Sequence, residues 1–312
     1  MALSIDQMRQ FLSRSYSSVN RNKVNGIYAE VAFYNHLAGL GYGDKLSPGG
    51  WIIRPTRVAR FGLGSVAVFP DGVPAGKELP VDRLAPPIPP SVEHAATFLR
   101  HAGIATYFCY PVEEGGQLRW IGVKRGDASA PPASDILHLL ERSFVQQMRF
   151  YNYLRHHSDV TPLNDEAILE QFPLESLRIY IRTKYYAEIS DIDRLIWGQQ
   201  TIYPVEVKEK TRPPSDRNIG DWFGLDVGPF TKLAFFKAWY GQLDALFVVR
   251  EIKSETDRSL VQWWVTNTTD IAKYASWVFS GGGPNMAGGA SAVIKVPIHA
   301  FRPLDETFMA AL

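Results

Sequence analysis

Two short apolar runs separated by a tight reversal constrain the fold more than any other part of the sequence. The first run covers 186–197, the second covers 201–208, and Gly198 lies in the reversal between them. Two such runs on either side of a glycine-containing reversal predict a β-hairpin. A lone hairpin is marginal in water, so this one needs a larger sheet. Helices and strands are expected on both sides of it, which predicts an α/β fold with a mixed central sheet flanked by helices.

The hairpin carries charges where packing alone would not need them. Side chains along a strand alternate between its two faces. Val205 and Val207 therefore share one face of the second run, and Glu206 and Lys208 share the other. An antiparallel partner strand can bring Asp193 to that same face. We expect two carboxylates and one ammonium group to meet on one side of the sheet.

This set of groups is typical of phosphoryl chemistry. Mg²⁺ prefers oxygen ligands and is often held by one or two carboxylates together with water and substrate phosphate. A neighbouring lysine can orient or deprotonate an attacking water. Asp191 lies on the same face as Asp193 and is an alternative ligand, although Asp193 stands closer to the middle of the apolar run.

The order of these residues carries a family resemblance. Asp193, followed by Glu206-Val207-Lys208, resembles the D…(D/E)-x-K motif of the PD-(D/E)XK nuclease superfamily. Ile192 stands where that motif has its proline.

The helix predicted over 25–40 adds to the resemblance. Four of its residues match the layout of the first core helix in members of the superfamily: Gly26, Glu30, Leu37 and Gly41. The resemblance implies that Glu30 assists catalysis. Glu141 is an alternative core-helix glutamate, because it lies in a stretch, 134–157, that we predict as one long helix capped by Ser134 or Asp135.

Among such nucleases the chain looks most like a type II restriction endonuclease. Its size fits, it has a large insertion before the hairpin, and it lacks a G-x-x-x-x-G-K-[ST] motif that would couple it to nucleotide hydrolysis. The resemblance implies Mg²⁺-dependent hydrolysis of double-stranded DNA at a specific site, carried out by a homodimer. Asp193 and Glu206 would hold the metal, and Lys208 would serve the attacking water. A structure-specific or RNA-acting nuclease, or a non-catalytic DNA-binding module with the same fold, remains an alternative.

The loop after the hairpin is a candidate for DNA contact. The stretch 208–224 combines basic residues, two prolines and an aromatic residue, and it directly follows Lys208. We expect Lys210, Arg212 and Arg217 to meet phosphates or base edges. Glu209 is expected to be solvated.

The chain is expected to contain a nuclease core with an inserted subdomain. Residues 62–90 are rich in proline and glycine, and a helix and two strands follow them. We therefore assign 1–61 and 134–312 to the core and 62–133 to the insertion, which could take part in DNA recognition. Downstream of the insertion, a short helix is expected over 164–171.

Composition limits the remaining possibilities. The net charge is +1 over 312 residues, so no global excess of basic residues indicates a passive nucleic-acid coat. Cys109 is the one cysteine, which excludes an internal disulfide and a cysteine zinc cluster, and its apolar neighbours predict a buried structural thiol. The sequence shows neither a signal peptide nor a long apolar run, so we expect a soluble cytoplasmic protein.

Overall fold

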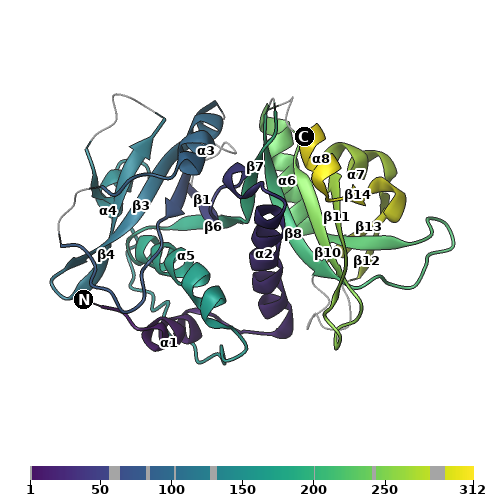
Figure 1. Cartoon of the computed structure of the whole chain (residues 1–312). Coiled ribbons are helices and arrows are strands. Elements are labelled where there is room, and N and C mark those ends of the chain that lie inside the picture. Colours follow the sequence, from purple (N-terminus) through teal and green to yellow (C-terminus); the bar gives the residue numbers. More distant parts are fainter. Residues whose placement is uncertain are drawn as a thin grey trace. The chain divides into compact units, whose positions relative to one another are not determined.

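The computed structural model describes residues 2–55, 64–81, 85–101, 103–126, 132–199, 201–240, 244–281 and 292–312. The chain forms two compact units. The first unit contains Met1–Tyr28 and Ser47–Ile192, and the second contains Ala29–Leu46 and Asp193–Leu312. Each is an α/β structure in which helices cover β-sheets (Figure 1).

The first unit is built on one six-stranded sheet in the order β5-β4-β3-β2-β1-β6. The strands are β1 (Gly50–Pro55), β2 (Val66–Pro70), β3 (Ala105–Glu114), β4 (Gln117–Arg125), β5 (Ser134–Asp135) and β6 (Ala187–Ile192). The sheet is mixed, because β2 and β3 run parallel while the other neighbours run antiparallel.

Helices cover both faces of this sheet. They are α1 (Ile5–Ser15), α3 (Pro90–His101), α4 (Ile136–Leu140) and α5 (Asp165–Lys184). α1 and α5 pack together over a core that includes Leu12 and Trp120, while α3 packs against β3 and β4. Asn164 is the N-cap residue of α5: its side-chain Oδ1 accepts a hydrogen bond from the main-chain N–H of Ala167.

The second unit contains two sheets, in the orders β14-β11-β10-β8-β7 and β12-β13-β9. Their strands are β7 (Arg194–Trp197), β8 (Ile202–Lys210), β9 (Trp222–Asp226), β10 (Leu246–Ile252), β11 (Leu260–Asn267), β12 (Ser276–Gly281), β13 (Ala292–Pro297) and β14 (Arg302–Pro303). The helices are α6 (Val227–Tyr240), α7 (Thr268–Tyr274) and α8 (Glu306–Ala311), with short 3-10 helices at Gly43–Lys45 and Ile298–Ala300. Helix α2 (Arg21–Gly39) begins in the first unit and continues into the second.

Strand β8 lies between two apolar cores of the second unit. On one face, Val205 and Val207 pack with Phe33 of α2. On the other face, Phe247 of β10 packs with Leu233 of α6. β8 and β10 run parallel, and β9 and α6 lie between them in the sequence (Figure 1). Opposite sides of β8 are therefore covered by α2 and by the α6 layer.

The structure divides the chain differently from the expected core and insertion. β2, β3 and β4 fall within 62–133, yet they belong to the same sheet as β1 and β6. The division instead falls within α2 and between Ile192 and Asp193. Pairing between strands distant in sequence sets this boundary, and local composition does not reveal such pairing.

The prediction of one long helix over 134–157 is wrong. α4 ends at Leu140, and the following residues form turns and bends. Val145 and Met148, two of the recurring apolar residues that indicated a helix, are exposed. The helix expected over 164–171 is present but extends to Lys184, with Pro173 inside it.

Cys109 is buried in β3, as expected for a structural thiol. Burial raises the pKa of its thiol far above the ordinary value. Within the described ranges, no helix is both long enough and apolar enough to cross a membrane.

Candidate functional site

Asp193 lies at the point where the first arm of the expected hairpin splits between two sheets. Before it, β6 pairs with β1 in the first unit; after it, β7 pairs with β8 in the second. The side chain is 3% exposed, and its Oδ2 accepts a hydrogen bond from the main-chain N–H of Val207 at 2.8 Å. The register that pairs Arg194 with Val205, continued by one residue, places Asp193 opposite Glu206. Residues directly opposite on an antiparallel pair share a face.

Glu206 and Lys208 lie on the face of β8 turned away from Val205 and Val207. The Glu206 side chain is 2% exposed, and its Oε1 lies 2.5 Å from the Lys208 Nζ. Asp193 therefore bonds to the main chain between Glu206 and Lys208, which pair with each other; that the three residues form a catalytic site stays a prediction. We call these three residues the Asp–Glu–Lys cluster.

A second acid–base pair lies beside the cluster. The Lys210 Nζ is 3.7 Å from Asp226 Oδ2. Burial lowers the pKa of Lys210, the charge of Asp226 opposes that shift, and the charge of Lys208 adds to it. Lys210 is thus engaged with Asp226 and lies in the electrostatic field of the cluster.

The reversal between β7 and β8 holds the two arms in register. The Gly198 N–H donates to the Thr201 carbonyl at 2.8 Å. A side chain at Gly198 would collide with the main chain of Leu312, so only glycine fits there. The tight reversal expected from the sequence is confirmed, and it fixes the register that places Asp193 opposite Glu206.

Glu30 belongs to the same unit as the cluster. It is half-buried on α2, between the buried residues Ala29 and Val31. Ala29 packs in the same core as Val205. Its assisting role stays a prediction.

Glu141, the alternative core-helix glutamate, lies in the first unit. It follows α4, is exposed, and pairs with His138 at 3.4 Å and with Lys184 at 3.9 Å. The long helix that would have made it a core-helix residue is absent from the described stretch 132–199.

The loop after β8 holds its two arginines in different environments. The Arg212 guanidinium lies 2.9 Å from Glu251 and 3.3 Å from Asp221, and these contacts raise its pKa. Glu251 is buried and also accepts the Trp264 Nε1–H at 2.7 Å, so Arg212 ties the loop to β10. Arg217 is exposed and has no carboxylate partner within the part of the chain that the structure describes.

Glu209 is buried, which corrects the expectation that it is solvated. Its carboxylate lies 2.5 Å from Arg250 and 3.0 Å from Arg258. Strand alternation could have predicted this position, because Glu209 shares a face with Val205 and Val207. A buried carboxylate requires partners, and the two arginines supply them.

The Asp–Glu–Lys cluster offers two carboxylates to a cation. Over the described ranges, no three Asp, Glu, His or Cys side chains converge in a way that could hold a metal ion. No protein-family model, curated protein or solved structure matches this chain.

Proposed function

We propose that the protein is a Mg²⁺-dependent nuclease of the PD-(D/E)XK type that hydrolyses phosphodiester bonds of double-stranded DNA. The observation that carries this proposal is that buried Asp193, just before β7, accepts the N–H of Val207 on β8, while the neighbours of Val207, buried Glu206 and Lys208, form an ion pair. Buried charges are costly unless they are paired or hold a metal. A sheet that needed only packing would not concentrate two carboxylates there.

The donor atoms fit Mg²⁺. Both ligands would be carboxylates, the hard oxygen donors that this ion prefers, and one or two of them together with water and phosphate are a common set. Val207 donates to one oxygen of Asp193, and this hydrogen bond orients the carboxylate. Glu206 is oriented in the same way by Lys208.

In the proposed reaction, each residue of the cluster has a separate task. A bound Mg²⁺ would polarise the phosphoryl group and lower the pKa of a water molecule. Asp193 and Glu206 would hold the metal. The Lys208 ammonium, held at 2.5 Å from Glu206, would orient the attacking water or neutralise charge developing on the phosphate oxygens.

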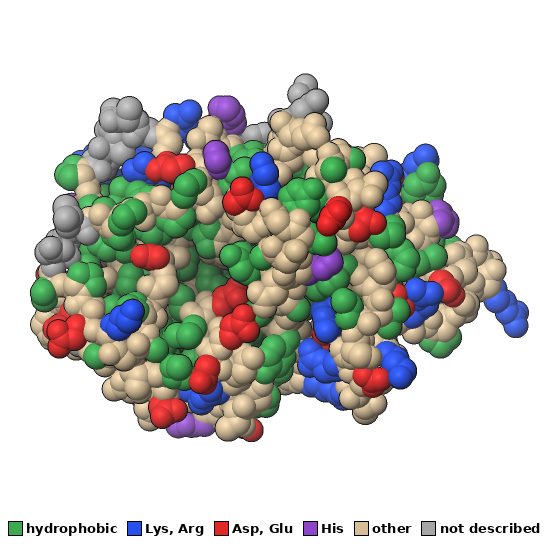
Figure 2. All heavy atoms as spheres, in the orientation of Figure 1, with side chains coloured by type: hydrophobic (Ala, Val, Ile, Leu, Met, Phe, Trp, Pro, Cys, Tyr) green, Lys and Arg blue, Asp and Glu red, His purple; other side chains and the backbone are tan. Residues whose placement is uncertain are grey.

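The surrounding fold supports the same assignment. The cluster lies in a mixed sheet with α2 against one face and α6 against the other, as expected for a nuclease of this type. Figure 2 shows Lys and Arg side chains gathered where β10 and β11 are joined. Lys253 is exposed there, and Arg217 is exposed in the loop after β8. Exposed cations of this kind suit contact with DNA phosphates.

The test is cleavage of plasmid and genomic DNA with Mg²⁺ by the wild-type protein and two lysine variants. Lys208→Ala should lower the cleavage rate by about a hundredfold or more and leave DNA binding largely intact. Lys273, an exposed lysine on α7 of the same unit, provides the matched control, and Lys273→Ala should cut at the wild-type rate.

Each outcome of the cleavage test has a defined meaning. Discrete fragments support a site-specific endonuclease, and a smear supports a nuclease without sequence preference. Cleavage of RNA but not DNA would move the proposal to an RNA-acting nuclease. Binding without cleavage of either, or a Lys208→Ala variant as active as Lys273→Ala, contradicts the proposal.

A further inference from the structure

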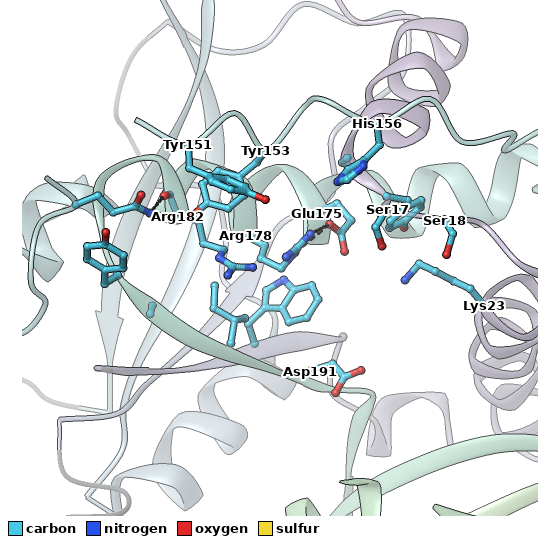
Figure 3. A pocket seen from close by; sticks show the side chains of 17 residues that line it. Ser17, Ser18, Lys23, Tyr151, Tyr153, His156, Glu175, Arg178, Arg182 and Asp191 are labelled. Atoms are coloured by element: carbon cyan, nitrogen blue, oxygen red, sulfur yellow. Dashed lines mark hydrogen bonds and ion pairs between the residues drawn. The ribbon is translucent and has the colours of Figure 1, made fainter. Parts of the chain in front are cut away.

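The first unit contains a pocket of about 870 Å³ that the proposed nuclease chemistry does not use. Four parts of the unit line it: the segment Ser15–Lys23, α5, strands β1 and β6, and the segment between Gln147 and His156. Figure 3 shows side chains from these parts directed toward one hollow. Ligand sites for small molecules commonly have this size.

Three Lys and Arg side chains line the pocket. Arg178 is held in place by buried Glu175, whose Oε2 accepts from Nε at 2.9 Å and from Nη2 at 2.6 Å. Within the described part of the chain, Lys23 and Arg182 have no carboxylate at ion-pair distance; each lies against an aromatic ring instead. Figure 3 shows all three charged ends turned toward the hollow. Lys23 and Arg182 are therefore positioned to bind an anionic ligand.

Aromatic rings line the same pocket. Tyr151 and Tyr153 lie with ring centroids 4.6 Å apart, and Gln147 donates to the Tyr153 hydroxyl at 2.8 Å. The indole N–H of Trp51 donates to the carbonyl of Leu174 at 2.8 Å, which fixes the ring. Tyr151 is 42% exposed, although large aromatic side chains gain most from burial. A planar ligand could stack on such a surface.

We infer that this pocket binds a nucleotide. A nucleotide combines a planar base, which stacks on aromatic rings, with a phosphate, which pairs with Lys and Arg. Asp191 and Glu175 also line the pocket and provide acceptors for the amino groups of a base. The volume accommodates one base, one sugar and one phosphate.

Two sources could supply this ligand, a free mononucleotide or a nucleotide turned out of a DNA strand. The inference does not rest on the proposed nuclease activity, because every residue that lines the pocket belongs to the first unit and the Asp–Glu–Lys cluster belongs to the second.

Calorimetric titration with nucleoside 5′-monophosphates tests the free source. The wild-type protein should bind a monophosphate at least about tenfold more tightly than the matching nucleoside or inorganic phosphate, because only the whole nucleotide meets both the rings and the cations. Arg182→Gln and Lys23→Gln should each weaken this binding by about tenfold or more. Arg142 is an exposed arginine of the same unit that does not line the pocket, and Arg142→Gln should bind as the wild type does.

A duplex that carries 2-aminopurine tests the strand source. Fluorescence of this base rises when it leaves the stack, so binding of the protein should raise the signal, and Arg182→Gln should suppress the rise while Arg142→Gln should not. A Lys208→Ala variant should behave as wild type in both assays, which separates failure of the pocket from failure of the nuclease proposal. The inference is overturned if neither assay shows binding to the pocket, or if Arg182→Gln and Arg142→Gln behave alike in both.

Discussion

Asp193 has a structural role and a proposed chemical role, and two substitutions at this position separate them. Its Oδ2 accepts the N–H of Val207 at 2.8 Å in the interior of the second unit. Asp193→Ala removes the acceptor and leaves a buried main-chain donor without that bond. Asp193→Asn keeps an oxygen at the same place and removes the charge. Both substitutions remove a ligand of the proposed metal site.

The structure sets the size of each effect on stability. A buried donor left without its acceptor costs about 1–3 kcal/mol, and bonds to charged acceptors lie toward the upper end. Since 1 kcal/mol shifts the melting temperature of a protein this large by about 2–4 °C, a loss of about 2 kcal/mol should make Asp193→Ala melt about 4–8 °C below wild type. Asp193→Asn should stay within about 1 kcal/mol of wild type, because its weaker hydrogen bond is offset by lower repulsion with Glu206.

Calorimetric melts in EDTA measure these differences, and cleavage assays with Mg²⁺ complete the test. We expect both variants to be inactive and only Asp193→Ala to lose stability. An Asp193→Ala variant as stable as wild type would refute the hydrogen-bonding role. An Asp193→Asn variant that cuts at the wild-type rate would refute the catalytic one.

Three further predictions follow from the ion pairs and the buried thiol. Arg217→Ala should weaken DNA binding and flatten its salt dependence without changing stability. Arg212→Ala, in contrast, should lower the urea midpoint, because buried Glu251 loses its ion pair. Equal stability of the two variants would contradict this distinction. Glu209→Gln should destabilise the protein by about 3 kcal/mol in urea unfolding, since Arg250 and Arg258 lose a buried counter-charge, and an unchanged midpoint would contradict it. Cys109 should resist a thiol reagent in the native protein and react once per chain in urea, because burial raises its pKa; rapid native reaction would disprove its burial.

Strand periodicity predicts which residues share a face of β8. The alternation of Val205, Glu206, Val207 and Lys208 along β8 is a local property, and the structure confirms that the two valines pack in the core while the charged pair lies on the other face. Gly198 likewise marked the reversal correctly. Strand alternation and the reversal depend only on residues that are close in the sequence, so the local pattern predicts them.

Long-range pairing could not be predicted in this way. The apolar run at 186–197 looked like one arm of a hairpin, yet it changes partner at Asp193, where β6 ends and β7 begins. β1 joins β6 to the strands expected in the insertion, and no local signal shows that these segments meet.

The helix errors have a physical cause as well. Periodic apolar residues after Leu140 favour a helix, but Val145 and Met148 are exposed and do not pack in the core. The helix expected over 164–171 stops short of Pro173, a residue type that removes a helical hydrogen bond. α5 nevertheless continues to Lys184, and the packing of this helix in the core of the first unit offsets that cost.

Binding of Mg²⁺ to the Asp–Glu–Lys cluster is the central claim, and thermal melts of three proteins test it most directly. A tenfold excess of Mg²⁺ over its dissociation constant stabilises the folded state by about 1.4 kcal/mol, or about 3–6 °C for a protein of this size. Wild type should show this rise, and Asp193→Asn should not. Asp191→Asn is the matched control, because Asp191 pairs with Trp51 in the sheet of the first unit, and it should keep the rise. A wild-type melt unchanged by millimolar Mg²⁺, or an equal rise in Asp193→Asn, would contradict the claim.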